Sequence, residues 1–482
     1  MSRPPATPAT PAAVVRDALR DSRPGAHWLE DPARPEPLPA LDGPAAADLV
    51  VVGGGYLGLW TALRAVEREP DRSVLVLEAD TCGHAASGRN GGFCEASLTH
   101  GFGNGMSRWP EEMSELLELG HDNLAGIEST VASYGIDCDF TRAGSLAIAD
   151  QPHQVEWLQG EHAAMQSMGL DVAWLDQDAL RARVGTATGL AAFHDPGSAI
   201  LEPARLAWGL RAACLARGVR ICEGTRVLGL SSTGSGVTLD TAGGPVAARH
   251  VVLATNAYPS LLRRLRLMTV PVYDYVLMTE PLTSAQRDAI GWHGREGYSD
   301  AGNQFIYART TRDGRILWGG YDAVYHYGSG IRPAYDHRAA TYETLAEKFF
   351  TVFPQLAGRD AVDGGVRFSH RWGGVIDTCT RFAAFYGTAM KGRVAYAAGF
   401  TGLGVGATRF AGDVVLDLLG GLDTPRTRLE MVRTKPVPFP PEPVRWAGIE
   451  ATRRSLAAAD ANGGRENLWL RATGALGLGF DS

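Results

Sequence analysis

The stretch DLVVVGGGYLGLWTALRAVEREPDRSVLVLEAD, residues 48–80, decides the fold of this chain. It contains LVVVG, a continuous apolar run typical of a strand buried on both faces of a parallel sheet. A glycine turn follows, and the next residues, YLGLWTALRAVERE, have the apolar spacing of a helix. The segment SVLVLEA predicts a second strand. This order of strand, turn, helix and strand predicts a Rossmann-type α/β unit.

The glycine turn has the spacing G-x-G-x-x-G, formed by Gly53, Gly55 and Gly58. The first glycine permits a tight turn, the second lets the backbone approach a pyrophosphate, and the third lets the helix pack closely on the sheet. The phosphate is held at the helix N-terminus by free N–H groups and the helix dipole. Glu78 ends the second strand, where a carboxylate accepts hydrogen bonds from ribose hydroxyls and repels the extra phosphate of NADP. The alternative is a chance glycine turn, but the complete unit favours a site for NAD or FAD.

Composition and charge narrow the classes of protein to which the chain can belong. A length of 482 residues predicts two domains. A hydrophobic content of 45% with 21% charged residues fits an ordinary globular protein. The net charge of -7 argues against nucleic acid as a partner. No run of about 18 apolar residues occurs, so we expect no integral membrane segment. The six cysteines contain no C-x-x-C pair, which predicts no metal site and a reduced, cytoplasmic setting.

The segment GHAASGRNGG, residues 83–92, indicates which dinucleotide binds. Small residues let the chain pass beneath a flat ring, and Arg89 and Asn90 offer donors to pyrophosphate or ring carbonyls. Taken alone, Arg89 is better interpreted as a surface arginine on a glycine loop. The segment resembles the flavin-contacting segment of the D-amino-acid oxidase superfamily. It is most similar to the branch that holds glycine oxidase, monomeric sarcosine oxidase and gamma-glutamylputrescine oxidase.

Three further matches extend this resemblance over roughly residues 48–420. LEPARLAWGL resembles the start of a family helix, with Glu202 in place of the usual asparagine. VVLATNAY is similar to the returning strand beside the pyrophosphate. YAAGFTGLGVGATRFAG is similar to the second flavin motif, whose helix N-terminus would point at the flavin N1–C2=O edge. Leu403 stands where the family more often has histidine or proline.

The resemblance implies FAD as the cofactor. The residues expected to bind it are Gly53, Gly55, Tyr56, Leu57, Gly58, Glu78, Ala79, Ser87, Gly88, Arg89, Asn90, Gly91, Gly92, Val227, Ala254, Thr255, Asn256, Gly399, Thr401, Gly402, Leu403, Gly404, Val405 and Gly406.

The resemblance also implies a fold of the α/β class: a glutathione-reductase-like, Rossmann-type FAD-binding domain with an inserted substrate domain built on a mixed or antiparallel sheet. The expected boundaries are 1–45 for an N-terminal arm, 46–105, 195–260 and 364–420 for the FAD-binding domain, 106–194 and 261–363 for the substrate domain, and 421–482 for a C-terminal extension. The first residues of the arm read as a loose segment. The extension lies beyond the resemblance, and we expect it to pack on its own body rather than on a membrane or a partner.

The activity implied by the resemblance is oxidation of an amine C–N bond. Hydride passes to flavin N5, and the imine that forms is hydrolysed by water; the cofactor carries the hard step. The expected substrate is a primary or secondary amine or an amino acid, with a carboxylate or another polar group some distance from the nitrogen. Two alternatives stay open: oxidation of a hydroxy acid or other alcohol, and a flavin-binding partner subunit without turnover.

Substrate contacts are expected from the second domain. Arg309 matches the carboxylate-binding arginine of glycine oxidase, and the alternative is a salt bridge between strands. Tyr273, Tyr275 and Tyr307 are expected to wall the pocket, and Trp372 to pack on the flavin or the pocket. All four aromatic residues have core packing as the alternative.

The chain departs from the family at the positions that attach flavin or activate oxygen. Cys379 is offset from Val375, which matches the flavin-linking cysteine of sarcosine oxidases, so we expect no cysteinyl link. A link through His84 stays a minority alternative. No lysine occurs before Lys348, so the usual lysine beside flavin N5 is missing. The electron acceptor is therefore left open between dioxygen, a quinone and a partner protein.

Overall fold

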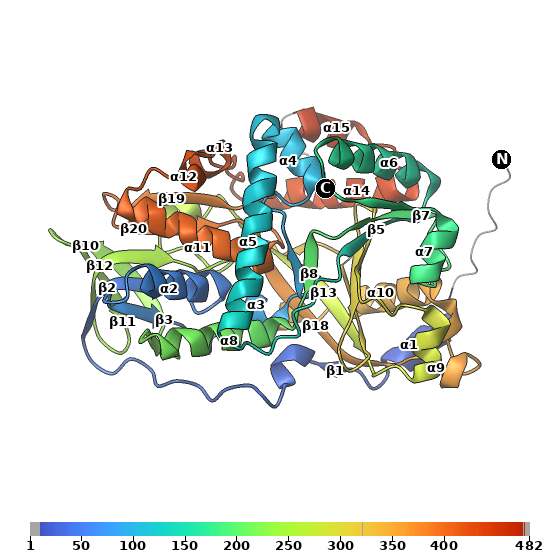
Figure 1. Ribbon diagram of the computed structural model, residues 1–482, viewed down its shortest axis with the longest axis horizontal. Coiled ribbons are helices and arrows are strands. Elements are labelled where there is room, and N and C mark those ends of the chain that lie inside the picture. The colour runs from blue at the N-terminus through green and yellow to red at the C-terminus, as the bar shows by residue number, and fades with distance from the viewer. Residues whose placement is uncertain (1–9, 321, 476, 478–482) are drawn as a thin grey trace.

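The computed structural model describes residues 10–320, 322–475 and 477. Figure 1 shows two parts side by side, each built on its own sheet, with the long helix α5 (Met113–Ser133) running along the junction between them. In the described part of the chain, no helix is long and apolar enough to cross a membrane.

The first part is an eight-stranded sheet in the order β10-β11-β12-β2-β3-β9, with β20 paired to β12 and β19 paired to β20. Strands β20, β12, β2, β3 and β9 pair in parallel. Strand β10 pairs antiparallel with β11, and β19 pairs antiparallel with β20. This is the arrangement that a Rossmann-type unit requires. The strand bounds are β2 (Ala45–Val52), β3 (Val74–Leu77), β9 (Arg220–Cys222), β10 (Val227–Ser232), β11 (Val237–Thr241), β12 (Val246–Leu253), β19 (Phe385–Ala389) and β20 (Val394–Ala398).

The second part is a ten-stranded mixed sheet in the order β1-β18-β13-β16-β15-β14-β5-β7-β6, with β17 paired to β13. The strand bounds are β1 (Arg23–Pro24), β5 (Ser145–Ala149), β6 (Ala173–Leu175), β7 (Ala191–Asp195), β13 (Val270–Thr279), β14 (Gly297–Asp300), β15 (Ile306–Thr310), β16 (Ile316–Gly320), β17 (Val324–Tyr325) and β18 (Phe368–Thr378). A separate pair links the two parts: β4 (Phe93–Glu95) and β8 (Ser198–Ile200).

One expected domain boundary needs correction. The sequence analysis assigns residues 364–420 to the FAD-binding domain. Strand β18 instead pairs with β13 along its length, from Val270 opposite Thr378 to Thr279 opposite Phe368. The FAD-binding segment therefore resumes after β18, at the turn that leads into β19.

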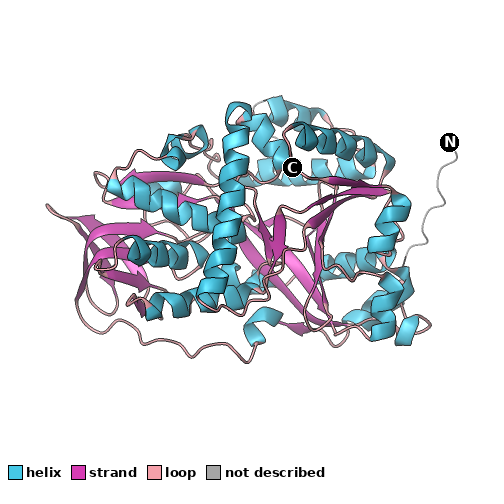
Figure 2. Ribbon diagram, in the orientation of Figure 1, coloured by secondary structure: helices cyan, strands magenta, loops and turns pink. Residues whose placement is uncertain are grey.

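Helices cover the two sheets as Figure 2 shows. Helices α2, α5, α8 and α11 share one core with the inner face of the eight-stranded sheet, and α1, α7, α9 and α10 pack on the ten-stranded sheet. The bounds of the helices not given so far are α1 (Ala12–Leu19), α2 (Tyr56–Arg68), α3 (Ala86–Arg89), α4 (Phe102–Arg108), α6 (Pro152–Ser167), α7 (Gln177–Arg183), α8 (Pro203–Ala216), α9 (Ser284–Ile290), α10 (Ala339–Val352), α11 (Gly404–Gly420), α12 (Pro425–Arg428), α13 (Glu430–Arg433), α14 (Val444–Ala461) and α15 (Leu468–Ala475).

The valine run of β2 shows why this strand is central. Leu49 and Val51 point into the helix-covered core, whereas Val50 and Val52 point into the core on the opposite face. Because side chains alternate along a strand, burial on both faces requires an unbroken apolar run. The continuous run in the sequence is thus explained by its position in the sheet.

The N-terminal arm is tied to the substrate side of the molecule. Arg23 and Pro24 form β1, which pairs in parallel with His370 and Arg371 of β18. Trp28 is buried, and its indole N–H donates to the carbonyl of Asn90 at 3.0 Å. Of the loose segment expected at residues 1–15, residues 1–9 lie outside the described residues, whereas residues 12–15 belong to α1.

The C-terminal extension packs against the chain's own body. Helix α14 is anchored by Asp460, whose carboxylate accepts hydrogen bonds from the backbone N–H groups of Asn303 (3.0 Å) and Gln304 (2.9 Å). Arg453, on the same helix, pairs with Asp322 at 2.8 Å. These contacts hold α14 against the loop that follows β14 and the segment that follows β16.

Candidate active site

A cavity of about 1400 Å³ lies between the two sheets. Its wall includes Val52 and Leu77 from the eight-stranded sheet and Val272 and Tyr307 from the ten-stranded sheet. The N-terminal ends of α2 and α11 both reach this cavity. The two glycine-rich motifs, far apart in the sequence, therefore open into one space.

The first glycine turn is shaped by contacts that only glycine permits. Gly53 has φ +113°, and a Cβ atom there would lie 2.5 Å from the carbonyl oxygen of Ala254. A Cβ on Gly58 would lie 1.9 Å from the carbonyl oxygen of Gly53. The turn, the helix start and the end of β12 are thus packed backbone against backbone, as the motif predicts.

Glu78 is fixed at the end of β3, facing the cavity. Its carboxylate accepts hydrogen bonds from the backbone N–H groups of Gly54 (2.6 Å) and Asp80 (2.8 Å). Burial raises the pKa of this carboxyl above its usual range, although the two N–H donors oppose the shift. An acceptor held in this way at the cavity wall suits the hydroxyls of a ribose.

The S-G-R-N-G-G segment is held largely by its own hydrogen bonds. Ser87 Oγ accepts from the backbone N–H of Tyr56 at 2.9 Å. Asn90 Oδ1 accepts from Gly92 N at 2.8 Å, and Arg89 pairs with Asp336 at 2.6 Å. The polar side chains of this segment thus fix the loop to itself, to α2 and to Asp336, and Ser87, Arg89, Asn90 and Gly91 line the cavity.

Asp377, which the sequence analysis did not single out, holds the turn before α11. The carboxylate accepts from Gly399 N at 2.5 Å, Phe400 N at 3.2 Å and Asn256 Nδ2 at 3.2 Å. Burial raises the pKa of Asp377 to about 7. It ends the segment SHRWGGVID, residues 369–377, where nothing in the sequence alone assigns it this role.

Most of the residues expected to bind FAD do line the cavity; five glycines do not, because each packs against a neighbouring segment behind the wall. The five are Gly58, Gly88, Gly92, Gly399 and Gly406. A Cβ on Gly406 would lie 2.4 Å from the carbonyl oxygen of Glu95, so this glycine brings α11 against β4. These positions shape the wall without forming its surface.

Of the five residues expected to contact the substrate, only Tyr307 lines the cavity. Arg309 lies on the same face of β15 as Tyr307, but Leu201 covers it. The carbonyl oxygen of Leu201 accepts a hydrogen bond from Arg309 Nη1. The guanidinium lies over the ring of Trp28 at 5.3 Å, and burial lowers its pKa to about 10. Arg309 is buried and outside the cavity wall, and its Nη2 has no hydrogen-bond partner among the described residues, so the expected carboxylate contact stays a prediction. No described carboxylate pairs with Arg309, so the salt-bridge alternative is not observed.

The other three residues support the wall from behind. Trp372 donates its indole N–H to the carbonyl of Arg89 at 2.8 Å. Tyr275 donates to the carbonyl of Tyr335 at 2.9 Å, and the hydroxyl of Tyr273 accepts from Arg332 N at 3.2 Å. Trp372 thus steadies the S-G-R-N-G-G segment through its backbone.

Asp274 is the functional candidate that the sequence analysis missed. Along β13 the residues Val272, Asp274 and Val276 face the cavity, whereas the two tyrosines between them face the core. Asp274 Oδ2 accepts from the Tyr307 hydroxyl at 2.6 Å, and Oδ1 accepts from Tyr275 N at 2.8 Å. Burial raises the pKa of Asp274 to about 6. Strict alternation along the strand would have selected this residue, since one strand face cannot hold both the tyrosines and Asp274.

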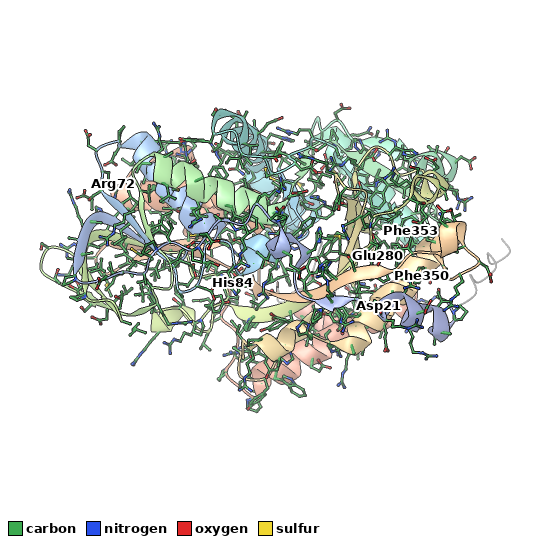
Figure 3. The ribbon with its side chains drawn as sticks, turned by 90° about the horizontal axis from the view of Figure 1, so that it is seen from below. Asp21, Arg72, His84, Glu280, Phe350 and Phe353 are labelled. Atoms are coloured by element: carbon green, nitrogen blue, oxygen red, sulfur yellow. The ribbon has the colours of Figure 1, made fainter. Side chains whose placement is uncertain are left out.

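Two residues considered for a covalent flavin link both line the cavity. His84 lies near the middle of the molecule in Figure 3, 3.8 Å from Asp80, and burial lowers its pKa. Cys379 is buried, and its sulfur contacts the carbonyls of Ala383 and Gly399.

Comparison with known proteins identifies the family. The family model described as "FAD dependent oxidoreductase", named DAO, matches residues 48–418. The chain belongs to the DAO family of FAD-dependent oxidoreductases. It is 30% identical over 397 residues to gamma-glutamylputrescine oxidoreductase of Escherichia coli, a match that covers 80% of this chain and 86% of that protein. It is 27% identical over 390 residues to the probable oxidoreductase OrdL of Haemophilus influenzae, covering 78% and 84% of the two chains.

The solved structures agree on the architecture of this DAO-family chain. Glycine oxidase from Geobacillus kaustophilus superposes with a TM-score of 0.66 at 21% identity, covering 81% of this chain and 99% of that chain. The predicted fold class is thereby confirmed. The family match confirms the expectations of an enzyme and of FAD as its cofactor. The two helix starts, the anchored Glu78 and the continuous cavity all fit a long dinucleotide of this kind.

Proposed function

We propose that this DAO-family enzyme oxidises a C–N bond of a primary or secondary amine, and that the amine binds at Asp274. The single observation that carries the proposal is the Asp274–Tyr307 pair. A carboxylate at the cavity wall accepts a hydrogen bond from Tyr307 at 2.6 Å and pairs with no described cation. An alkylammonium group supplies the positive charge that such a carboxylate lacks, together with further N–H donors.

The residues proposed to hold FAD are those of the glycine turn, Glu78, the S-G-R-N-G-G segment and the start of α11. When bound, FAD supplies the acceptor for the hydride that leaves the substrate carbon. Support for the placement comes from the backbone packing at Gly53 and Gly58 and from the N-termini of α2 and α11, both of which reach the cavity.

Asp274 has two tasks in this proposal. As a carboxylate it accepts N–H hydrogen bonds from the ammonium group and fixes the nitrogen against the cavity wall. Because burial raises its pKa to about 6, Asp274 Oδ1 or Oδ2 is also able to take one proton from the ammonium nitrogen. The neutral amine that results has the lone pair from which the imine forms. Tyr307 keeps the carboxylate in one orientation.

The test is anaerobic mixing of the purified holoenzyme with amines, amino acids and hydroxy acids. We expect amines to bleach the flavin absorbance and Asp274→Asn to slow bleaching by about 10²-fold, the loss typical of an acid–base group. Bleaching by hydroxy acids but not by amines would contradict the proposal and favour alcohol oxidation. Tyr327→Phe serves as a control, since Tyr327 is exposed and lies outside the cavity wall.

A further inference from the structure

A second set of carboxylates lines the same cavity, away from Asp274. Glu95 ends β4, Asp195 ends β7, and Glu161 lies on α6. Side chains alternate along a strand, so Glu95 shares a face of β4 with Phe93. Phe93 packs edge-on against Tyr307, with ring centroids 5.8 Å apart. The cavity wall therefore runs from the Asp274–Tyr307 pair through Phe93 to Glu95.

The three carboxylates lie close enough to influence one another. Burial, and after it the charge of Asp195, raises the pKa of both Glu95 and Glu161 to about 7. Asp195 is held in place, because its Oδ1 accepts from Gly197 N at 2.7 Å. All three carboxylates line the cavity, and the charge of Asp195 disfavours the ionised form of both glutamates.

No described cation neutralises this cluster. Among the described residues, Glu95 has neither an ion pair nor a side-chain hydrogen bond, and the surface that it exposes is cavity wall. Glu161 has only the backbone N–H of Gly103 near it. Arg453, across the cavity, is already paired with Asp322 and Glu450. Buried carboxylates without partners are costly, and a cation that enters the cavity removes that cost.

From this arrangement we infer that the substrate carries two separated ammonium groups, as a diamine or polyamine does. The reacting ammonium binds at Asp274, and the second binds among Glu95, Glu161 and Asp195. This inference rests on the proposed function, because it takes the Asp274 end as the site of oxidation. The second ammonium does not react; it orients the chain of the substrate along the wall. A substrate carboxylate would be repelled by the same cluster.

The first test measures binding without turnover. Holoenzyme reduced with dithionite is titrated by calorimetry with straight-chain α,ω-diamines and with monoamines of equal chain length. We expect each diamine of fitting length to bind about ten- to a hundredfold more tightly than its monoamine, the ratio given by one charge-assisted hydrogen bond. Glu95→Gln and Glu161→Gln, which keep the side-chain shape, should each reduce that ratio by about tenfold.

Glu156→Gln is the matched control, since Glu156 lies on α6 like Glu161 but is exposed and outside the cavity wall. Its ratio of diamine to monoamine affinity should equal that of the unaltered protein. Equal affinities for diamines and monoamines, or a ratio that Glu95→Gln leaves unchanged, would overturn the inference.

Anaerobic bleaching separates this inference from the proposed function. Monoamines that bleach the flavin as readily as diamines would contradict the second ammonium site and leave amine oxidation standing. Diamines that bind through Glu95 but never bleach the flavin would support the cation site and contradict the proposed oxidation. Amino acids that bind more tightly than diamines would overturn the inference through the repulsion that it requires.

Discussion

At the scale of single residues, the Asp274–Tyr307 hydrogen bond governs the ionisation of the proposed amine site. Burial raises the pKa of Asp274 to about 6, and the Tyr307 hydroxyl opposes that rise. Tyr307→Phe removes the opposing hydrogen bond, so the pKa should move further up. We therefore expect the acidic limb of kcat/KM against pH, near pH 6 in the unaltered enzyme, to shift to higher pH in Tyr307→Phe. The exposed Tyr327, changed to Phe, should leave the limb in place.

Glu95 gives a second prediction, on stability. Its pKa is raised to about 7 in the folded state, so the folded protein holds its proton over a range where the unfolded chain has lost it. The unaltered protein therefore loses stability as pH rises from about 4.5 to about 7. Glu95→Gln lacks this loss, and its free energy of unfolding should exceed that of the unaltered protein by up to about 3 kcal/mol at pH 8.

Urea unfolding of both proteins at pH 5 and pH 8 checks the prediction. The difference between their free energies of unfolding removes the contributions of the titrating groups that the two proteins share. A difference of the same size at both pH values would contradict it. An excess stability of the unaltered protein at pH 8 would show that Glu95 has a cationic partner in the folded state.

Some of these residues could be predicted from the sequence, and others could not. Gly53, Gly58 and Glu78 were predictable, because a turn, a helix start and a strand end follow one another within a single βαβ unit. Asp274 was not selected, because the sequence analysis placed the flanking Tyr273 and Tyr275 at the pocket, whereas alternation along β13 puts Asp274 there and the tyrosines in the core. Arg309 was assigned by resemblance, but its strand face is covered by Leu201, a contact that no local pattern indicates.

At the scale of elements, the contact between α11 and β4 depends on one glycine. A Cβ on Gly406 would lie 2.4 Å from the carbonyl oxygen of Glu95, whereas a Cβ on Gly404 would meet nothing within 4 Å. Gly406→Ala must push the helix start away from β4, which we expect to cost about 1–3 kcal/mol of unfolding free energy in the flavin-free protein. Gly404→Ala should change it by less than about 1 kcal/mol. Equal losses in the two variants would contradict the packing argument.

The junction between α14 and the loop after β14 gives a prediction about substrate affinity. Asp460 accepts hydrogen bonds from both backbone N–H groups of Asn303 and Gln304, and both of these residues line the cavity. Asp460→Ala should free the loop and raise KM for an amine by roughly tenfold, while the flavin content is retained. Glu466→Ala, at an exposed carboxylate near the same helix, is the control. Loss of flavin in Asp460→Ala would contradict a role confined to the substrate side.

Elements differed in how far the sequence could predict them. The strands and helix of residues 48–80 have clear periodicity, and the structure has them as β2, α2 and β3. Strand β18 was assigned to the wrong sheet, because an extended segment with glycines does not indicate which sheet edge it joins. The two-residue β1 has no sequence signal at all, since its pairing depends on residues of β18.

At the scale of the whole molecule, FAD bound in the cavity as proposed would link the two sheets. A ligand that binds the folded state alone stabilises it by about 2.7 kcal/mol at a concentration of 100 times its Kd. We expect removal of FAD to lower the unfolding temperature and to speed hydrogen exchange in β2, α11 and β13 together, because all three reach the cavity. The contact of α1 with α10 is remote from it and serves as the internal control. Faster exchange confined to β2 and α11 would contradict a shared cavity.

The pairing of Arg23 and Pro24 with His370 and Arg371 has a consequence for how the protein is made. These N-terminal residues leave the ribosome long before β18 is synthesised, so they have no partner while most of the chain emerges. The segment that includes Trp28, the support for both Asn90 and Arg309, therefore completes its pairing only after β18 has been translated. A segment made early is thus among the last to find its place.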